Sequence, residues 1–180
     1  MTGDAPTLVD RIVAIAAALD SAGLPWAFGG ALALAYATEE PRATRDIDVN
    51  VFVPATDAAA IYDALPEGVR HDDADIDTAR RDDQVRLWWD DTPVDVFFAA
   101  DTFHDEVAMR CRRVPFAGAT ISILAAEDLA VFKALFDRPK DWVDITTMAE
   151  SQALDVERAA DRLADLLGDD DRVQRLRSIP

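Results

Sequence analysis

Apolar residues recur at regular spacings in the first part of the chain. Residues 7–22 place leucine, isoleucine and alanine three or four positions apart, which predicts an amphipathic helix that ends before a glycine and a proline. A short apolar run at 26–28 and an alanine-rich run at 31–37 predict a strand and a second helix. Gly29 and Gly30 lie between these runs and predict a tight turn from strand to helix.

The segment 46–53, with the sequence DIDVNVFV, begins as an alternation of polar and aliphatic residues. This period of two predicts a strand that is buried on one face. Asp46 and Asp48 then project together from the opposite face. The alternative is that the two acids only solvate the wet face of a strand in a chain rich in acids.

The remaining pattern divides into a strand-rich part and a helical part. A short helix is expected to end near Leu65, and an acidic loop is expected to follow it through Asp83. Later strands are predicted at 85–89, 94–98, 112–116 and 120–124, with a turn at 90–93, and helices at 125–137, 141–150 and 155–167, followed by a frayed tail. The layout is an α/β half followed by a small helical half, and the change comes near residue 125.

Composition limits the classes of partner. The 180 residues are half apolar, which is enough to build a core, and 35 acids against 18 bases give a net charge of −17. This charge disfavours an extensive nucleic-acid surface or an anionic membrane as partner. The basic clusters that remain for an anionic partner are Arg110, Arg112 and Arg113, and Arg172, Arg175 and Arg177.

Cysteine use and hydropathy indicate the compartment. Cys111 is the single cysteine and cannot form an internal disulfide, and the first residues lack the layout of a signal peptide. The apolar tracts fall short of the roughly 20 residues that a membrane helix needs. We therefore expect a cytoplasmic protein without a membrane segment.

A third acid, Asp95, lies between Val94 and Val96 in a later predicted strand. With Asp46 and Asp48 it would supply three hard oxygen ligands of the kind that suit Mg²⁺, with Mn²⁺ as an alternative. Two such ions about 4 Å apart can activate an attacking oxygen and stabilise a leaving one in phosphoryl-type transfer. The metal is therefore expected to act together with a phosphate substrate.

The Gly29-Gly30 turn is a candidate phosphate contact, since small residues at the start of a helix let backbone N–H groups approach a phosphate. Two glycines are also what an ordinary tight turn requires. Their position sixteen residues before an aspartate pair favours the phosphate interpretation, because phosphoryl-type transfer needs phosphate contacts and metal ligands together.

Lys133 lies inside the apolar stripe of a predicted helix, four residues after Leu129 and three before Phe136. A lysine in that position must either snorkel to solvent or find a partner. The candidate partners are a nucleotide phosphate and the acids Asp141 and Asp144, which share one face of the next predicted helix. Both a structural and a functional lysine fit this pattern.

The letters Asp-Ile-Asp recur at Asp75 and Asp77, but no aliphatic alternation follows them. An EF-hand loop counted from Asp73 would need glycine and glutamate where Thr78 and Gln84 stand. We therefore expect a solvated loop here.

With these residues in hand, the chain resembles the minimal nucleotidyltransferases of the polymerase-beta-like superfamily. The stretch FGGALALAYATEEPRATRDIDVNVFV matches the Gly-Gly turn and aspartate pair of that family, and VDVFFA offers the third aspartate. The stretch AAEDLAVFKALFDRPKDWVDI resembles the helical segment of the AbiEii toxin branch, with Lys133 as its lysine and Asp141 and Asp144 as the acids that follow. The resemblance implies an α+β fold with a mixed sheet flanked by helices, in which 1–124 form the core and 125–180 a helical segment packed on it as one compact unit.

The resemblance also implies an activity, the transfer of a nucleoside monophosphate from an NTP to an acceptor hydroxyl. It assigns Asp46, Asp48 and Asp95 as ligands of two Mg²⁺ ions and gives Asp95 the proton of the acceptor. The remaining implied contacts are with the nucleotide or support it: Gly29, Gly30, Arg45 and Lys133 as nucleotide contacts, and Asp141 and Asp144 as residues that orient Lys133. The acceptor is tRNA or another RNA, a protein or a small hydroxyl compound, and an antitoxin protein is an implied partner.

Two other classes compete with an active enzyme. One is a catalytically inactive nucleotidyltransferase fold that binds a nucleotide or a protein, which predicts metal-dependent NTP binding without turnover. The other is an interaction protein whose acids serve only solubility, which predicts no such binding.

Overall fold

The computed structural model describes residues 5–180, which form two compact units. The sheet unit comprises the described part of Met1–Phe28 together with Thr44–Ile123, and the helical unit comprises Gly29–Ala43 and Leu124–Pro180. The chain therefore leaves the sheet unit at Gly29, returns to it at Thr44 and leaves it again after Ile123.

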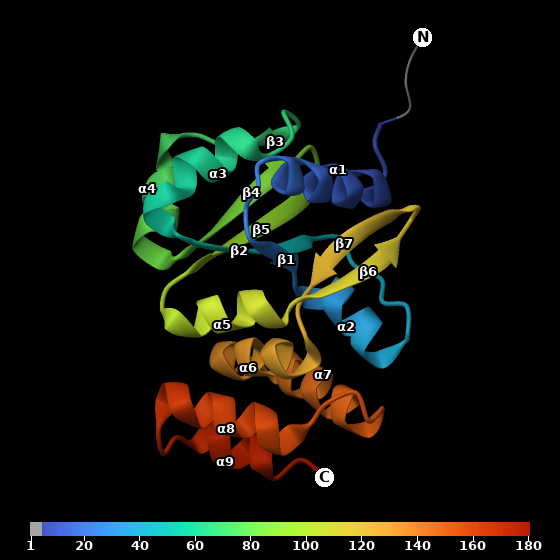
Figure 1. The fold of residues 1–180 in the computed structure, drawn as a ribbon, viewed down its shortest axis with the longest axis vertical. Helices are drawn as coiled ribbons and strands as arrows, with labels where there is room; N and C mark the ends of the chain where they lie inside the picture. The colour runs from blue at the N-terminus through green and yellow to red at the C-terminus, as the bar shows by residue number, and fades with distance from the viewer. Residues whose placement is uncertain (1–4) are drawn as a thin grey trace. The chain divides into compact units, whose positions relative to one another are not determined.

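A mixed sheet is the frame of the sheet unit (Figure 1). Its strands are β1 (Trp26–Phe28), β2 (Ile47–Pro54), β3 (Val69–Arg70), β4 (Gln84–Trp89), β5 (Thr92–Ala99), β6 (Arg112–Phe116) and β7 (Ala119–Ile123). Their order across the sheet is β3-β4-β5-β2-β1-β7-β6. The pairs β2–β5 and β1–β7 are parallel, and the other neighbours are antiparallel. The α+β class with a mixed sheet is thus confirmed.

Helices lie on both faces of this sheet. They are α1 (Leu8–Ser21), the 3₁₀ turn η1 (Ala55–Asp57), α3 (Ala58–Ala64), α4 (Asp73–Asp82) and α5 (Thr102–Arg110). Figure 1 shows α1 and α3 on one side of the sheet and α5 on the other. Val49 of β2 and Val96 of β5, on the aliphatic side, are fully buried. On the other side Asp48 and Asp95 are only partly buried, whereas Asn50 and Phe52 farther along β2 are buried. The part of this face that can host chemistry is therefore the part around the two acids.

Arg11 fixes α1 to the β4–β5 turn. Its guanidinium is buried and donates hydrogen bonds to the side chains of Asp90, Asp91 and Thr92. The hydrogen bond and the charge of Arg11 hold the pKa of Asp91 below its ordinary value. The turn itself has only two residues, because β5 already begins at Thr92, so the expected turn at 90–93 is wrong by two residues.

The expected acidic loop through Asp83 is also wrong, because most of it is helix α4. Asp72 caps this helix: its side chain accepts from the backbone N–H of Asp75, and the Asp75 carboxylate accepts from the N–H of Asp72. A reciprocal capping box of this kind stabilises a helix that has little apolar surface. Tyr62 in α3 donates to the backbone carbonyl of Asp75 and anchors the helix.

The helical unit contains α2 (Gly30–Thr38), α6 (Ala126–Phe136), α7 (Pro139–Glu150), α8 (Val156–Leu167) and α9 (Asp171–Arg177). Helix α6 contacts each of the other four. The expected frayed tail is instead α9, since Asp170 caps it and the side chains of Val173 and Leu176 are buried. Within residues 5–180, none of the helices is long and apolar enough to span a membrane.

Candidate active site

Asp48 and Asp95 lie side by side on the polar face of the sheet. They are register partners on the parallel strands β2 and β5. Neighbouring strands are about 4.8 Å apart, and partners in register point to the same face. The two carboxylates that the sequence assigns to separate strands therefore meet at one place.

Arg86 extends this row onto β4, where it is the register partner of Asp95. Its Nε donates to Oδ1 of Asp95 and its Nη2 donates to Oδ2, both at 2.7 Å. The Asp95 side chain is 15% exposed and that of Arg86 is 53% exposed. The hydrogen bonds and charge of Asp95, followed by the charges of Asp46 and Asp48, raise the pKa of Arg86 above its ordinary value. All three predicted carboxylates thus act on one guanidinium.

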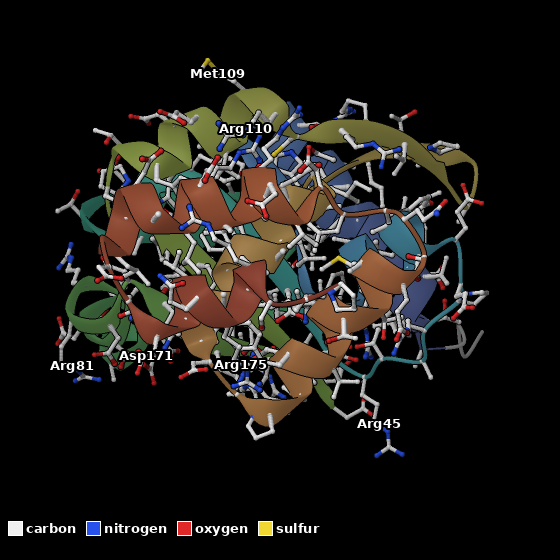
Figure 2. All side chains as sticks on the ribbon, turned by 90° about the horizontal axis from the view of Figure 1, so that it is seen from below. Arg45, Arg81, Met109, Arg110, Asp171 and Arg175 are labelled. Carbon is white, nitrogen blue, oxygen red and sulfur yellow. The ribbon has the colours of Figure 1, made fainter. Side chains whose placement is uncertain are left out.

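Asp46 comes immediately before β2 and is held from its own loop. The Thr44 hydroxyl donates to Oδ1 of Asp46 at 2.6 Å. Arg45, predicted to contact the nucleotide, is exposed, and Figure 2 shows its side chain directed away from the ribbon. The role of Arg45 therefore stays a prediction.

The donor set of this row fits a divalent cation, because aspartate oxygens are the ligands that Mg²⁺ prefers and the acids already share a cationic partner in Arg86. The three carboxylates do not form a ready-made cage. In residues 5–180, no group of three or more histidine, cysteine or acidic side chains has metal-binding geometry. Both oxygens of Asp95 accept from Arg86, so the acid is engaged by a guanidinium in this state.

The Gly29-Gly30 turn opens α2 in the helical unit. Gly30 is the first residue of the helix and has φ of 50°, a left-handed conformation that favours glycine. Gly29 is the cap residue and brings no side chain to the N–H groups of the first turn. Such a helix start can accept an anionic group directly at its backbone.

We expect Gly30→Ala to weaken both folding and nucleotide binding. The left-handed φ costs an alanine about 1 kcal/mol. Gly118→Ala is the matched control, since Gly118 also has positive φ but lies in the β6–β7 turn, where an added Cβ would meet open space. Urea unfolding should show a similar loss for both variants. Calorimetry should show weaker NTP binding for Gly30→Ala alone, and equal NTP affinities would contradict the assignment.

Lys133 lies in a buried charge cluster of the helical unit. Its Nζ contacts Oδ2 of Asp144 at 2.7 Å and Oδ1 of Asp141 at 3.6 Å. The lysine is 8% exposed, so it does not snorkel to solvent. The guanidinium of Arg138 makes two hydrogen bonds to Asp141 and its backbone N–H a third, and Arg42 lies 3.8 Å from Asp144. Three cations thus surround two carboxylates, which leaves a formal excess of one positive charge.

The electrostatics of this cluster are clearest at Asp141, whose side chain has no exposed surface. Burial favours the protonated acid and raises its pKa. The hydrogen bonds of Arg138 and the charge of Lys133 outweigh burial, and the pKa of Asp141 lies below its ordinary value. Asp141 therefore stays charged and holds Lys133 and Arg138 in place.

Sequence reasoning missed the three arginines of these clusters, Arg42, Arg86 and Arg138. Arg86 had a usable signal, because a two-residue turn at 90–91 places it opposite Asp95. Five of the six arginines in the basic clusters considered instead are paired with acids: Arg110 with Glu106, Arg113 with Asp20, Arg172 with Asp170, Arg175 with Asp137 and Arg177 with Asp161.

Comparisons with known proteins agree with this fold. The family model described as nucleotidyl transferase AbiEii toxin, Type IV TA system, matches residues 11–180. The solution structure of the antibiotic-resistance factor ANT(2'')-Ia is 20% identical with a TM-score of 0.55, over 94% of this chain and 89% of that chain. A nucleotidyltransferase-like protein from Paracoccidioides brasiliensis is 14% identical with a TM-score of 0.54, over 96% and 92% of the two chains. No curated protein sequence gives a significant match. The two structures share the fold of this chain.

Proposed function

Since this chain belongs to the AbiEii family of nucleotidyl transferase toxins, we propose that it moves a nucleoside monophosphate from an NTP to an acceptor hydroxyl and releases pyrophosphate. The nucleotidyltransferase activity is that of the family. The observation that carries the assignment to a site is the row of Asp48 and Asp95, in register on one sheet face with Asp46 beside them.

In this proposal Asp46, Asp48 and Asp95 hold divalent cations, with Mg²⁺ as the first candidate and Mn²⁺ as the second. A pair of ions bound there would supply charge neutralisation for the triphosphate and activation of the attacking oxygen. Thr44 has its own part in this arrangement, because its hydrogen bond fixes the direction of one Asp46 oxygen.

The reaction forms one bond between the acceptor oxygen and the α-phosphorus and breaks the bond from that phosphorus to the pyrophosphate oxygen. Asp95 takes the proton of the acceptor hydroxyl as the new bond forms. Gly29 and Gly30 contact the triphosphate through backbone N–H groups, and Lys133 and Arg45 supply positive charge to it. Asp141 and Asp144 orient Lys133 in this proposal. Their contacts with its ammonium group support that role.

Two acceptor classes are each favoured by an observation. The net charge of −17 and the arginines already paired with acids favour a small hydroxyl compound over a docked RNA. One solved relative of the fold, ANT(2'')-Ia, was crystallised with adenylyl-2''-tobramycin; it is 18% identical, with a TM-score of 0.54 over 94% of each chain. The resemblance of the helical segment to the AbiEii toxin branch favours RNA as acceptor, and membership of a toxin family favours an antitoxin protein as partner.

The test is to incubate the protein with Mg²⁺ and each α-labelled NTP in the presence of bulk tRNA, protein or small hydroxyl compounds. We expect label in one acceptor class and an equal amount of pyrophosphate. Absence of label from every class, at enzyme concentrations that bind NTP, would contradict the proposal.

The toxin assignment has its own test in cells. Induction should arrest growth, and Asp46→Ala should abolish the arrest because a metal ligand is lost, while the protein level stays the same. Arrest of equal strength by the variant would separate toxicity from nucleotidyl transfer.

A further inference from the structure

The Arg86–Asp95 pair is the feature of the sheet unit that the proposed reaction does not explain. The guanidinium makes parallel hydrogen bonds to both oxygens of a carboxylate that the reaction needs as a metal ligand and proton acceptor. This bidentate geometry is the most directional of the contacts that a guanidinium can form with a carboxylate.

A divalent cation that takes the same lone pairs of Asp95 competes with Arg86 for them. Direct coordination places a metal about 2.1 Å from a carboxylate oxygen, whereas each oxygen of Asp95 now has a guanidinium nitrogen 2.7 Å away. Two cations at such separations repel each other strongly where water is limited. A cation bound on that side of Asp95 therefore displaces the guanidinium, whereas a cation on the opposite lone pairs would leave the pair intact.

Arg86 is the cation that can leave at low cost. Its side chain is 53% exposed, so the guanidinium regains hydration when it releases the acid. Pairs with an exposed partner contribute little net stability. The residues on either side of it on the same face of β4, Gln84 and Trp88, are exposed as well, which leaves room for the side chain to move along the strand.

We propose that Arg86 is a built-in counter-ion of Asp95, which a divalent cation must displace before the site is loaded. The inference rests on the proposed function, because it assumes that Asp95 is a metal ligand. It assigns Arg86 as a positioning residue that lowers cation affinity and stabilises the row of acids when no metal is bound.

The alternative is a permanent pair, in which Arg86 aims Asp95 at the cation and strengthens its binding. The two roles predict opposite signs for the effect of removing the guanidinium. Displacement predicts tighter cation binding, and permanent positioning predicts weaker binding.

The experiment measures Mn²⁺ affinity of the full chain by electron paramagnetic resonance, without nucleotide. We expect Arg86→Gln to bind Mn²⁺ about tenfold more tightly than the parent, because one competing two-pronged ion pair is lost. Arg86→Lys keeps the positive charge but cannot form the bidentate pair, so its Mn²⁺ affinity should lie between those of the parent and Arg86→Gln. Arg70→Gln is the matched control: Arg70 is exposed on β3, donates to the Asp90 carbonyl, and its removal should change affinity less than twofold.

Equal or weaker Mn²⁺ binding by Arg86→Gln would overturn the inference, as would an equal gain for Arg70→Gln, which would indicate only a change in net charge. These outcomes are separate from failure of the proposed function. If Asp48→Asn binds Mn²⁺ as tightly as the parent, the site assignment itself is wrong, whatever Arg86→Gln does.

Discussion

Replacing Asp48 with asparagine should lower the rate of nucleotidyl transfer by about three orders of magnitude while leaving the fold intact. Asp48 lies in the middle of the acid row, next to Asp95 in register and two residues from Asp46. Asparagine keeps the shape of the side chain but removes the charge that a divalent cation requires. The measurement is label transfer at saturating NTP, together with urea unfolding to show that stability is retained.

Asp77→Asn is the matched control for this prediction. Asp77 is the second acid of the other Asp-Ile-Asp sequence, but it is exposed on α4 and faces no acid row. It should transfer label at the parental rate. A rate for Asp48→Asn within tenfold of the parent would contradict a role for this acid in the reaction.

The second large effect is on stability, at the charge cluster of the helical unit. We expect Asp141→Asn to lower the free energy of unfolding by about 3 kcal/mol at pH 7, because Lys133 and Arg138 lose a buried carboxylate. Asp165→Asn, an exposed acid on α8, should change it by less than about 0.5 kcal/mol.

The pH dependence of this loss follows from the pKa of Asp141, which is lower in the folded protein than in the unfolded chain. Such a group contributes its full stability above its unfolded pKa, about 3.9, and loses it as the pH falls through the folded pKa. The difference between the parent and Asp141→Asn should therefore be constant from pH 7 to about pH 5 and shrink below about pH 4. A difference independent of pH would assign the loss to packing instead.

Much of the fold follows from local pattern. The alternation of β2 and the apolar stripes of α1 and α6 predict those elements within one or two residues of their observed bounds. The errors have identifiable causes. Helix α4 has little apolar periodicity, and its formation depends on a capping box that the acidic composition obscured.

The sequence indicates the acids of the row on β2 and β5 but not Arg86, the cation that pairs with Asp95. The alternation of the strands gives the face of Asp48 and Asp95, and the parallel register brings them together. Predicting Arg86 as the partner of Asp95 requires the length of one turn. A four-residue turn at 90–93 would place Trp88 opposite Asp95, whereas the observed two-residue turn places Arg86 there. Turn length is weakly specified here, because Asp90 adopts a positive φ that its residue type does not demand.

The partners of Lys133 show a different limit of prediction from sequence. Helical spacing places Asp141 and Asp144 on one face of α7, and both contact the lysine. Arg42 and Arg138 join them from outside the regular elements or from a helix cap, where no periodic pattern indicates direction. Side chains in such segments are positioned by tertiary contacts alone.

The most direct test of the proposed catalytic centre is a crystal structure of the protein with Mg²⁺ and a non-hydrolysable NTP. We predict that Asp48 and Asp95 each place an oxygen about 2.1 Å from a bound Mg²⁺, with Arg86 released from Asp95. A complex in which the nucleotide is bound while Asp95 keeps both hydrogen bonds to Arg86, and Mg²⁺ contacts none of Asp46, Asp48 and Asp95, would contradict the account.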